Sequence, residues 1–307
     1  MQIRLSNPRG FCAGVDRAIE IVERALERYG APVYVLHEIV HNRHVLEDLR
    51  SRGVRFVDDL DAIPSGAVTV FSAHGVSDNV EKIGRDRELR VIDATCPLVT
   101  KVHTQARLYG NEDYELILIG HPGHPEVEGT EGRFPGKVHI LSTPEEVRSL
   151  VVEDPSRLAY VTQTTLSVDD TREVIDALCE KFPGIQGPDL TDICYATQNR
   201  QDAVRETAKE VDILIIVGSS NSSNSNRLQE LGLRAGVPSY LVDHPDQIKP
   251  EWFDGVKDIG VSAGASAPEV LVQLILDQIR TLGVSSIVEV PGQEENLVFK
   301  LPAGLIE

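Results

Sequence analysis

The stretch NPRGFCAGVDRAIEIVERALE, residues 7–27, passes at Cys12 from an extended segment into an amphipathic helical pattern. The same change of pattern occurs at Cys96, in VIDATCPLVTKVHTQARL, residues 91–108. It occurs again at Cys194, in LTDICYATQNRQDAVRETA, residues 190–208. The three stretches are spread almost evenly along the chain, so we interpret them as the starts of three similar structural units.

Three thiols in this setting point to metal chemistry. A thiol just before a helix ionises easily, because the helix dipole and the open N–H groups favour the thiolate. Thiolates bind iron–sulfur clusters and zinc, and three of them leave one position of a four-coordinate metal open. The alternative is three half-buried structural thiols, which would suit any single cysteine but does not explain the shared pattern.

The fourth cysteine has a different setting. In TREVIDALCEKF, Cys179 stands at a helical spacing from Val174, Ile175 and Leu178. We therefore predict that Cys179 packs in the core and binds no metal.

Composition excludes several classes of partner. The 307 residues suffice for two or three domains, and 30 Lys and Arg against 48 Asp and Glu give a net charge of −18. Nucleic acids and anionic membranes need clustered positive charge, so neither is an expected partner. The N-terminus lacks a signal-peptide core, the aliphatic runs are too short for a bilayer, and the cysteines are not closely paired. We expect reduced thiols and a cytoplasmic location.

Between the cysteines, short β-branched runs alternate with amphipathic helical stretches, which predicts an α/β fold with mostly parallel strands. Each predicted strand ends in a polar, Gly-containing or hydroxyl-rich loop. Ligands bind at the carboxyl ends of parallel strands, so all six loops are candidate site walls. These loops are HEIVHN (37–42), SAHGVS (72–77), GHPGHPEVEG (120–129), TQTTLS (162–167), GSSNSSNSN (218–226) and SAGASAP (262–268).

Read by thirds, the chain repeats this architecture without repeating its sequence. We predict three α/β domains around one pocket on a pseudo-threefold axis, followed by a tail over residues 283–307 with NLVFKL as its one strand-like stretch. The predicted domains are residues 1–97 with Cys12, His41 and His74, 98–193 with His124, Glu126 and Thr164, and 194–282 with Cys194, Ser222–Asn224 and Ser266.

The loops favour an oligophosphate ligand but no nucleotide. No P-loop motif occurs and no G-x-G-x-x-G follows a strand. In GSSNSSNSNRLQEL, hydroxyls, an amide and backbone N–H groups at a helix start form a candidate anion cradle without Lys. Taken alone, this loop is better explained as a helix cap and polar loop than as an anion cradle. The histidines, hydroxyls and amides of all six loops together suit a diphosphate.

HPGHPEVEG also contains a candidate acid. Glu126 follows His-Pro, so we expect its carboxyl to face the site with His124. Partial burial favours the protonated carboxyl, which suits a proton donor. Glu128 and Glu131 are expected to face solvent, although loop composition alone does not separate the three.

Nine motifs in order resemble one family, that of 4-hydroxy-3-methylbut-2-enyl diphosphate reductase, and the likeness extends over about residues 1–280. This family comprises three α/β domains around a central [4Fe–4S] cluster and catalyses the last step of the methylerythritol phosphate route to isoprenoids. The motifs are NPRGFCAGVDRAI, HEIVHNR, FSAHGVS, DATCPLVTKVH, GHPEVEGT, TQTTLSVDDT, DICYATQNRQ, GSSNSSNSNRL and SAGASAP.

The resemblance implies a role for each candidate residue. Cys12, Cys96 and Cys194 would bind three irons of the cluster and leave the fourth open to the substrate. Glu126 would supply a proton, and Thr164 would lie near the reacting hydroxyl. The diphosphate would be bound by His41, His74, His124, Ser222, Ser223, Asn224 and Ser266.

The implied reaction is a two-electron, two-proton removal of an allylic hydroxyl as water, giving isopentenyl and dimethylallyl diphosphates. The implied electron donor is a ferredoxin or flavodoxin. Two other readings stay open at this point. One is a zinc hydrolase with three thiolate ligands, and the other is a non-catalytic iron–sulfur sensor, although a sensor needs no acid beside its ligand.

Overall fold

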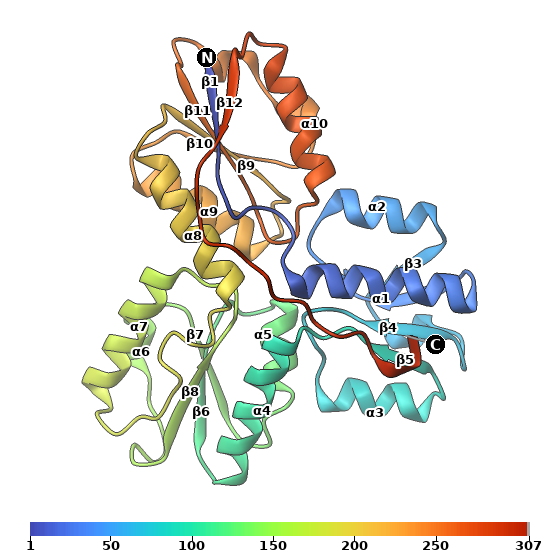
Figure 1. Cartoon of the computed structure of the whole chain (residues 1–307). Coiled ribbons are helices and arrows are strands. Elements are labelled where there is room, and N and C mark those ends of the chain that lie inside the picture. Colours follow the sequence, from blue (N-terminus) through green and yellow to red (C-terminus); the bar gives the residue numbers. More distant parts are fainter. Residues whose placement is uncertain (306–307) are drawn as a thin grey trace. The chain divides into compact units, whose positions relative to one another are not determined.

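The structure is a computed structural model that describes residues 1–305. The chain divides into two compact units, each assembled from separate stretches. Unit 1 contains residues 1–16, 40–49 and 195–298, and unit 2 contains residues 17–39, 50–194 and 299 onward. Within the described range, every pairing between named strands is parallel, which confirms the predicted α/β class (Figure 1).

Unit 1 is built on one five-stranded sheet. In spatial order its strands are β10 (Ser239–Val242), β9 (Ile213–Val217), β11 (Asp258–Ala263), β1 (Gln2–Leu5) and β12 (Ser286–Glu289). Its helices are most of α2 (Arg43–Ser51), then α8 (Tyr195–Ala208), α9 (Ser223–Arg234), α10 (Glu269–Arg280) and the 3₁₀ turns η2 (Pro245–Gln247) and η3 (Pro250–Phe253).

Helices cover both faces of this sheet, which is why its central strands are apolar throughout. In β9, Ile213, Ile215 and Val217 pack in one cluster with the apolar side of α10. Leu214 and Ile216 point the other way and pack with residues of α8 and α9. Each fully buried aliphatic side chain of this kind contributes about 1.5–3 kcal/mol to the free energy of unfolding.

Unit 2 is built on two sheets. One has the order β3 (Val54–Val57), β2 (Val33–Leu36), β4 (Val68–Phe71), β5 (Arg90–Asp93), and the other has the order β7 (Val138–Leu141), β6 (Glu115–Ile119), β8 (Leu158–Thr162). The helices are most of α1 (Ala13–Tyr29), then α3 (Asp78–Asp86), α4 (Pro97–Asn111), α5 (Pro125–Glu131), α6 (Pro144–Ser149), α7 (Val168–Lys181), η1 (Leu60–Ala62) and η4 (Ala303–Leu305).

All six strands expected to precede polar loops are present, as β2, β4, β6, β8, β9 and β11. The N-terminal strand differs from the division by thirds, because β1 pairs with β11 and β12 of the last third. Ile3 is in register with Ile259 on one side and with Ile287 on the other. Local periodicity does not specify a partner so distant in sequence. The domain boundaries near residues 97 and 193 stay a prediction.

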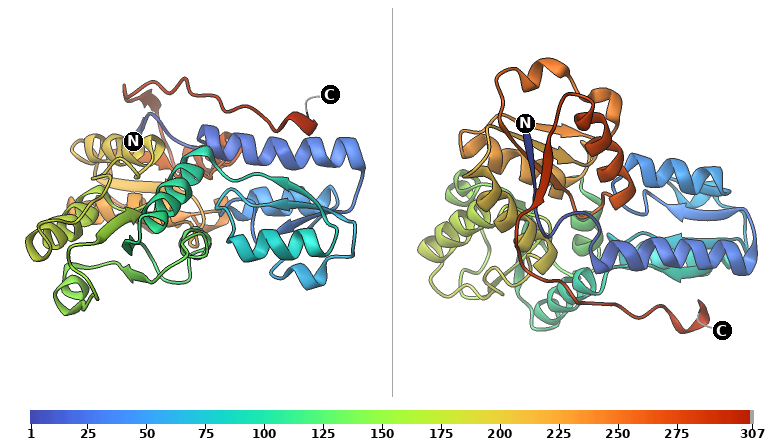
Figure 2. Two further views of the ribbon diagram at one scale, coloured as in Figure 1. Left: turned by 90° about the horizontal axis from the view of Figure 1, so that it is seen from below. Right: turned by 45° about the horizontal axis from the view of Figure 1, so that its top comes forward.

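The expectation for the tail was wrong in one respect. NLVFKL, residues 296–301, has no strand structure, and Val298 is 86% exposed. The strand of this region is β12, which lies beside β1, and Val290 N continues the pairing by donating to Leu5 O (2.9 Å). Residues 290–302 contain no helix or strand (Figure 2). Apolar residues alone do not make a strand where no neighbouring edge accepts their hydrogen bonds.

The expectation for Cys179 was also wrong, because its side chain is exposed. Val174, Ile175 and Leu178 form the buried stripe of α7. Cys179 directly follows Leu178, and one residue turns the helix by about 100°, which carries the thiol off the stripe. Across residues 1–305, none of the helices combines the length and apolarity that a bilayer crossing requires.

Candidate functional site

The three candidate ligand cysteines have the same local structure. Each is the residue directly before a helix, because α1, α4 and α8 begin at Ala13, Pro97 and Tyr195. The predicted helix after each cysteine is therefore confirmed. The predicted extended segment is present only before Cys96, which follows β5, whereas the residues before Cys12 form bends and those before Cys194 form turns. Four N–H groups at a helix start have no partner within the helix, so each thiol lies beside open donors.

Each cysteine is also tied to one of the polar loops by its backbone N–H. The acceptors lie in the loops after β11, β4 and β8, so a cysteine and a strand-end loop are held together three times. The bonds run from Cys12 N to Ala265 O (3.3 Å), Cys96 N to Ala73 O (3.0 Å) and Cys194 N to Thr164 O (3.1 Å).

The direction of the pKa shift of Cys12 is opposite to the sequence expectation. Burial raises the pKa of the Cys12 thiol, and this outweighs the opposing effects of Arg200 and the N–H groups of Val15 and Gly14. Burial disfavours the charged thiolate and so opposes the effect of the helix start. Metal binding would then have to displace the proton.

In unit 1, the hydroxyl-rich loop forms a buried polar cluster. Ser222 caps α9, and its Oγ accepts hydrogen bonds from Ser225 N (3.3 Å) and Ser225 Oγ (3.1 Å). Ser266 Oγ donates to His41 O (2.8 Å) and is 3.5 Å from Ser222 Oγ. Asn224 Oδ1 accepts from Ala265 N (3.0 Å). The structure thus gathers four predicted site residues of this unit, and it also confirms the helix-cap role of Ser222.

In unit 2, two predicted histidines lie together. The rings of His74 and His124 are perpendicular, with centroids 5.7 Å apart. Gly75, which follows His74, has φ +78°, and a Cβ there would lie 2.5 Å from His103 Cε1. Glycine is therefore required for both the backbone conformation and the close approach, and this fixes the turn that presents His74.

Glu126 is the most distinctive titratable group of unit 2. It is only 2% exposed, whereas Glu128 and Glu131 are exposed as expected. Its Oε1 accepts from Thr164 N (2.6 Å) and its Oε2 from Thr164 Oγ1 (3.1 Å). Burial raises the pKa of Glu126 to about 7, although the two bonds from Thr164 oppose the rise. A carboxyl group with this pKa can give up a proton near neutral pH.

This pKa predicts a pH dependence of stability. A carboxyl whose pKa is raised on folding stabilises the fold below its unfolded pKa, and this contribution is lost as pH rises through about 7. Between pH 5.5 and 8, the group should lower the free energy of unfolding by about 2 kcal/mol. We expect Glu126→Gln to remove this part of the pH dependence. Urea unfolding of metal-free wild type and variant at both pH values measures it, and equal slopes with pH would contradict it.

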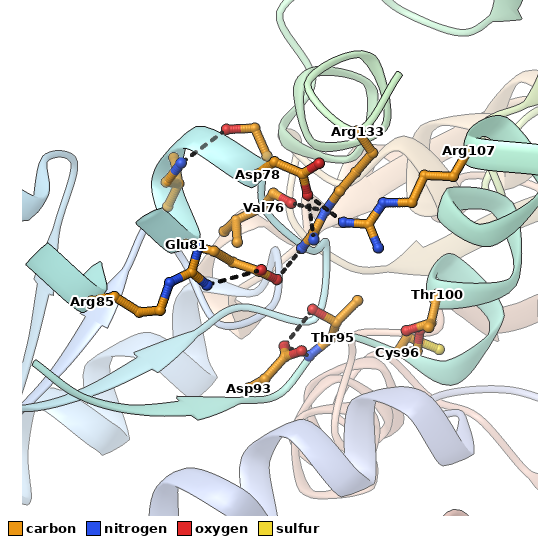
Figure 3. Close-up of polar contacts among 12 residues, drawn as sticks. Val76, Asp78, Glu81, Arg85, Asp93, Thr95, Cys96, Thr100, Arg107 and Arg133 are labelled. Carbon is orange, nitrogen blue, oxygen red and sulfur yellow. Dashed lines mark hydrogen bonds and ion pairs between the residues drawn. The ribbon is translucent and has the colours of Figure 1, made fainter. Parts of the chain in front are cut away.

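A buried arginine supports the loop that carries His74. Arg133, only 7% exposed, donates Nε to Val76 O (2.6 Å) and Nη1 to Asp78 Oδ1 (2.8 Å) (Figure 3). Its Nη2 donates to Glu81 Oε1 (2.5 Å), and Arg107 forms a further ion pair with Asp78. Burial alone would raise the pKa of Asp78, but Arg107 and Arg133 hold it below its usual value. The loop after β4 is thereby fixed at its C-terminal end.

The turn before Cys96 is fixed by a carboxylate. Asp93 Oδ1 accepts from Thr95 N (2.8 Å) and Thr95 Oγ1 (2.5 Å), and Figure 3 shows this pair beside Cys96 at the start of α4. Before Cys194 the buried carboxylate is Asp192, which sequence reasoning did not single out. Its Oδ2 accepts from Thr162 N (3.3 Å), and its charge contributes to the raised pKa of Glu126. Its position two residues before a candidate ligand cysteine was the available signal.

The predicted residues are divided between the units. Unit 1 holds Cys12, His41, Ser222, Ser223, Asn224 and Ser266, and unit 2 holds Cys96, Cys194, His74, His124, Glu126 and Thr164. Within either unit, as far as residue 305, no three His, Cys, Asp or Glu side chains form a group that could hold a metal ion. The assignment of the three cysteines to one cluster accordingly stays a proposal.

Comparison with known proteins gives one consistent result. Residues 3–280 match the family described as LytB protein. The 4-hydroxy-3-methylbut-2-enyl diphosphate reductase of Hahella chejuensis is 58% identical over 309 residues, covering 99% of this chain and 98% of that protein. The protein of the same name from Burkholderia pseudomallei is 57% identical, covering 100% of this chain and 98% of that protein.

Solved structures agree with the family match. The E-1-hydroxy-2-methyl-but-2-enyl-4-diphosphate reductase of Plasmodium falciparum superimposes with a TM-score of 0.94 at 38% identity, covering 99% of this chain and 96% of that chain. A second structure is described as (E)-4-hydroxy-3-methyl-but-2-enyl diphosphate reductase, the terminal enzyme of the non-mevalonate pathway. It gives a TM-score of 0.66 at 33% identity, covering 91% of this chain and 99% of that chain.

Proposed function

This chain belongs to the LytB protein family, and from that premise we propose that it reduces (E)-4-hydroxy-3-methylbut-2-enyl diphosphate to isopentenyl and dimethylallyl diphosphates. Two electrons and two protons enter, the allylic C–O bond breaks, and the hydroxyl leaves as water. One proton completes the water and the other adds to the allylic carbon skeleton. Glu126 is the observation within the chain that carries the proposal, because it is a buried acid with a pKa of about 7.

Membership of this family implies an iron–sulfur enzyme. We propose one [4Fe–4S] cluster with Cys12, Cys96 and Cys194 as ligands and one iron open to substrate. The donor set fits this group, because thiolates are the usual cluster ligands and the three thiols share one backbone setting. When bound, the cluster supplies the electrons and a Lewis-acidic iron.

The chain's own residues would donate the proton that the leaving hydroxyl needs. Hydroxide is a poor leaving group, so cleavage of the C–O bond needs a proton on the departing oxygen. Thr164 holds both oxygens of Glu126, through its N–H and its hydroxyl. Thr164 therefore fixes the direction of the carboxyl and offers a hydroxyl beside it. In the proposed role, Glu126 donates the proton and Thr164 keeps the acid oriented toward the substrate hydroxyl.

The diphosphate would be bound by neutral and histidine donors. His41, Ser222, Ser223, Asn224 and Ser266 of unit 1 and His74 and His124 of unit 2 are the proposed contacts. The start of α9 adds open N–H groups and the positive end of a 12-residue helix. Such donors bind an anion in a chain whose net charge is −18.

Two variants distinguish the anion-binding role of this loop from its role as a helix cap. We expect Ser223→Ala to weaken diphosphate affinity about 10-fold or more, which corresponds to about 1.5–3 kcal/mol for one hydrogen bond to a charged group. Ser222→Ala should weaken affinity and also lower the free energy of unfolding by about 1 kcal/mol, because the cap is lost. Calorimetric titration with substrate and urea unfolding measure the two quantities.

Ser220→Ala is the matched control, because Ser220 is an exposed serine of the same loop. It should leave both quantities unchanged. If Ser222→Ala and Ser223→Ala both bind substrate like wild type, the loop is a helix cap and not an anion site.

The proposed electron donor is a ferredoxin or flavodoxin, and the cytoplasmic location stays a prediction. Anaerobic purification with iron and sulfide analysis tests the function, followed by turnover with dithionite and a viologen dye. We expect a brown protein that consumes substrate and two reducing equivalents per product. A colourless zinc protein that hydrolyses the diphosphate would contradict the proposal, as would a brown protein that binds substrate without turnover.

A further inference from the structure

A cation follows each of the three cysteines by five or six residues along its helix. The cations are Arg17 on α1, Lys101 on α4 and Arg200 on α8. Sequence reasoning gave none of them a role, and the proposed chemistry does not use them. We refer to these three residues as the clamp cations.

The two arginines bind equivalent backbone groups. Arg17 Nη1 donates to Ala94 O (3.3 Å) and Thr95 O (3.0 Å), the carbonyls of the two residues before Cys96. Arg200 Nε and Nη2 donate to Gly10 O (2.9 and 2.7 Å), and Nη2 donates to Phe11 O (3.1 Å). Gly10 and Phe11 are the two residues before Cys12. Arginine suits this task because its planar fork reaches neighbouring acceptors from one side.

Lys101 also binds the segment before its cysteine, Cys194, but through one carbonyl and one carboxylate. Its Nζ donates to Thr191 O (2.9 Å) and lies 3.3 Å from Asp192 Oδ1. The contacts follow a cyclic order along the chain. The cation after Cys12 binds the segment before Cys96, the cation after Cys96 binds the segment before Cys194, and the cation after Cys194 binds the segment before Cys12.

The clamped segments contain the cysteine amides already described. Gly10 N donates to Ala263 O (3.1 Å) and Cys12 N to Ala265 O (3.3 Å). Ala94 N donates to Phe71 O (3.0 Å) and Cys96 N to Ala73 O (3.0 Å). The segments before Cys12 and Cys96 are thus bound through two N–H groups by the end of a strand and the loop after it, and through two carbonyls by an arginine. The segment before Cys194 is bound through the N–H of Cys194 and one carbonyl. Both sides together determine the direction in which the cysteine side chain leaves the backbone.

The C-terminal tail binds two of the clamp cations. In unit 1, Arg200 is fully buried and its Nη1 donates to Glu295 Oε1 (3.0 Å) and Oε2 (3.2 Å). Asn199 Nδ2 also donates to Glu295 Oε1 (3.0 Å). In unit 2, Arg17 Nε donates to Lys300 O (2.8 Å). Burial of a guanidinium without a counter-charge lowers the stability of the fold, and the carboxylate of Glu295 supplies this counter-charge to Arg200.

We propose that Arg17, Lys101 and Arg200 are positioning residues for the three cysteines, and that the tail locks Arg200 through Glu295 and Arg17 through the carbonyl of Lys300. The significance of these contacts rests on the proposed ligand role of the cysteines. The contacts themselves exist in the metal-free chain, so they can be tested without a cluster.

Hydrogen exchange of the metal-free full chain is the first test. Arg17→Gln is expected to speed exchange at Ala94 and Cys96 about tenfold or more and to leave Gly10 and Cys12 unchanged. Glu295→Gln should speed exchange at Gly10 and Cys12 and leave exchange at Ala94 and Cys96 unchanged. This variant is preferred to replacement of Arg200, because loss of a fully buried arginine would disturb folding as well. Arg24→Gln and Glu294→Gln are matched controls, since both residues are exposed neighbours on the same helix or tail.

The midpoint potential and the electron paramagnetic resonance spectrum after loading with iron and sulfide are the second test. Loss of the Arg17 charge should make the cluster potential more negative, because a positive charge favours the reduced cluster. The potential of Arg24→Gln should equal that of wild type. Unchanged exchange in both Arg17→Gln and Glu295→Gln, or an unchanged cluster potential and spectrum in Arg17→Gln, would overturn the positioning role. If wild type takes up no cluster, the proposed function fails while exchange still decides whether the clamps hold their segments.

Discussion

Glu126→Gln is expected to lower turnover by about 10²–10⁴-fold, the usual contribution of a general acid. Glutamine keeps the shape of the side chain, and its Oε1 can still accept from Thr164 N while its amide N–H donates to Thr164 Oγ1, but it has no transferable proton. Iron content and substrate affinity should stay at wild-type levels, because Glu126 is neither a proposed cluster ligand nor a proposed phosphate contact. Steady-state kinetics with dithionite and a viologen, with iron analysis on the same samples, make the measurement.

Two neighbouring carboxylates provide the control. Glu128 and Glu131 belong to the same short helix, α5, but both are exposed. Glu128→Gln and Glu131→Gln should keep nearly full activity. Normal turnover by Glu126→Gln together with an inactive Glu128→Gln would show that Glu128, and not Glu126, is the acid.

Cys→Ser at position 12, 96 or 194 is expected to abolish most cluster binding and, with it, activity. A serine alkoxide is a poorer ligand for iron than a thiolate, and its hydroxyl does not ionise near neutral pH. The three variants should behave alike because the three backbone settings are alike. Iron and sulfide content per chain and the visible spectrum measure the loss. A brown, fully active Cys96→Ser protein would contradict the ligand assignment.

Cys179→Ser is the matched control for these variants. The side chain is exposed on α7, so the substitution should change the free energy of unfolding by no more than about 0.5 kcal/mol. A core cysteine would lose packing energy on substitution, but this thiol lies outside the buried stripe of α7. Cluster content and activity should equal those of wild type.

The local pattern of the sequence determined much of the fold and of the candidate site. The six strands before polar loops and the three helices after the cysteines follow from runs of adjacent residues, and all are present. The sequence favoured Glu126 over Glu128 and Glu131 because it follows His-Pro, but only the burial of its side chain in the folded chain separated the three. Family motifs then assigned chemical roles that no periodicity specifies.

Tertiary structure decided what depends on neighbours distant in sequence. The pairing of β1 with β11 and β12 and the unpaired conformation of residues 296–301 depend on which strand edges are available. The pKa of Glu126 depends on the atoms that exclude water from it, and the raised pKa of Cys12 has the same cause. Arg200 and Glu295 look like ordinary surface charges in the sequence. Only the folded chain buries the arginine against the carbonyls before Cys12, because burial and pairing are properties of the surrounding structure and not of the residue.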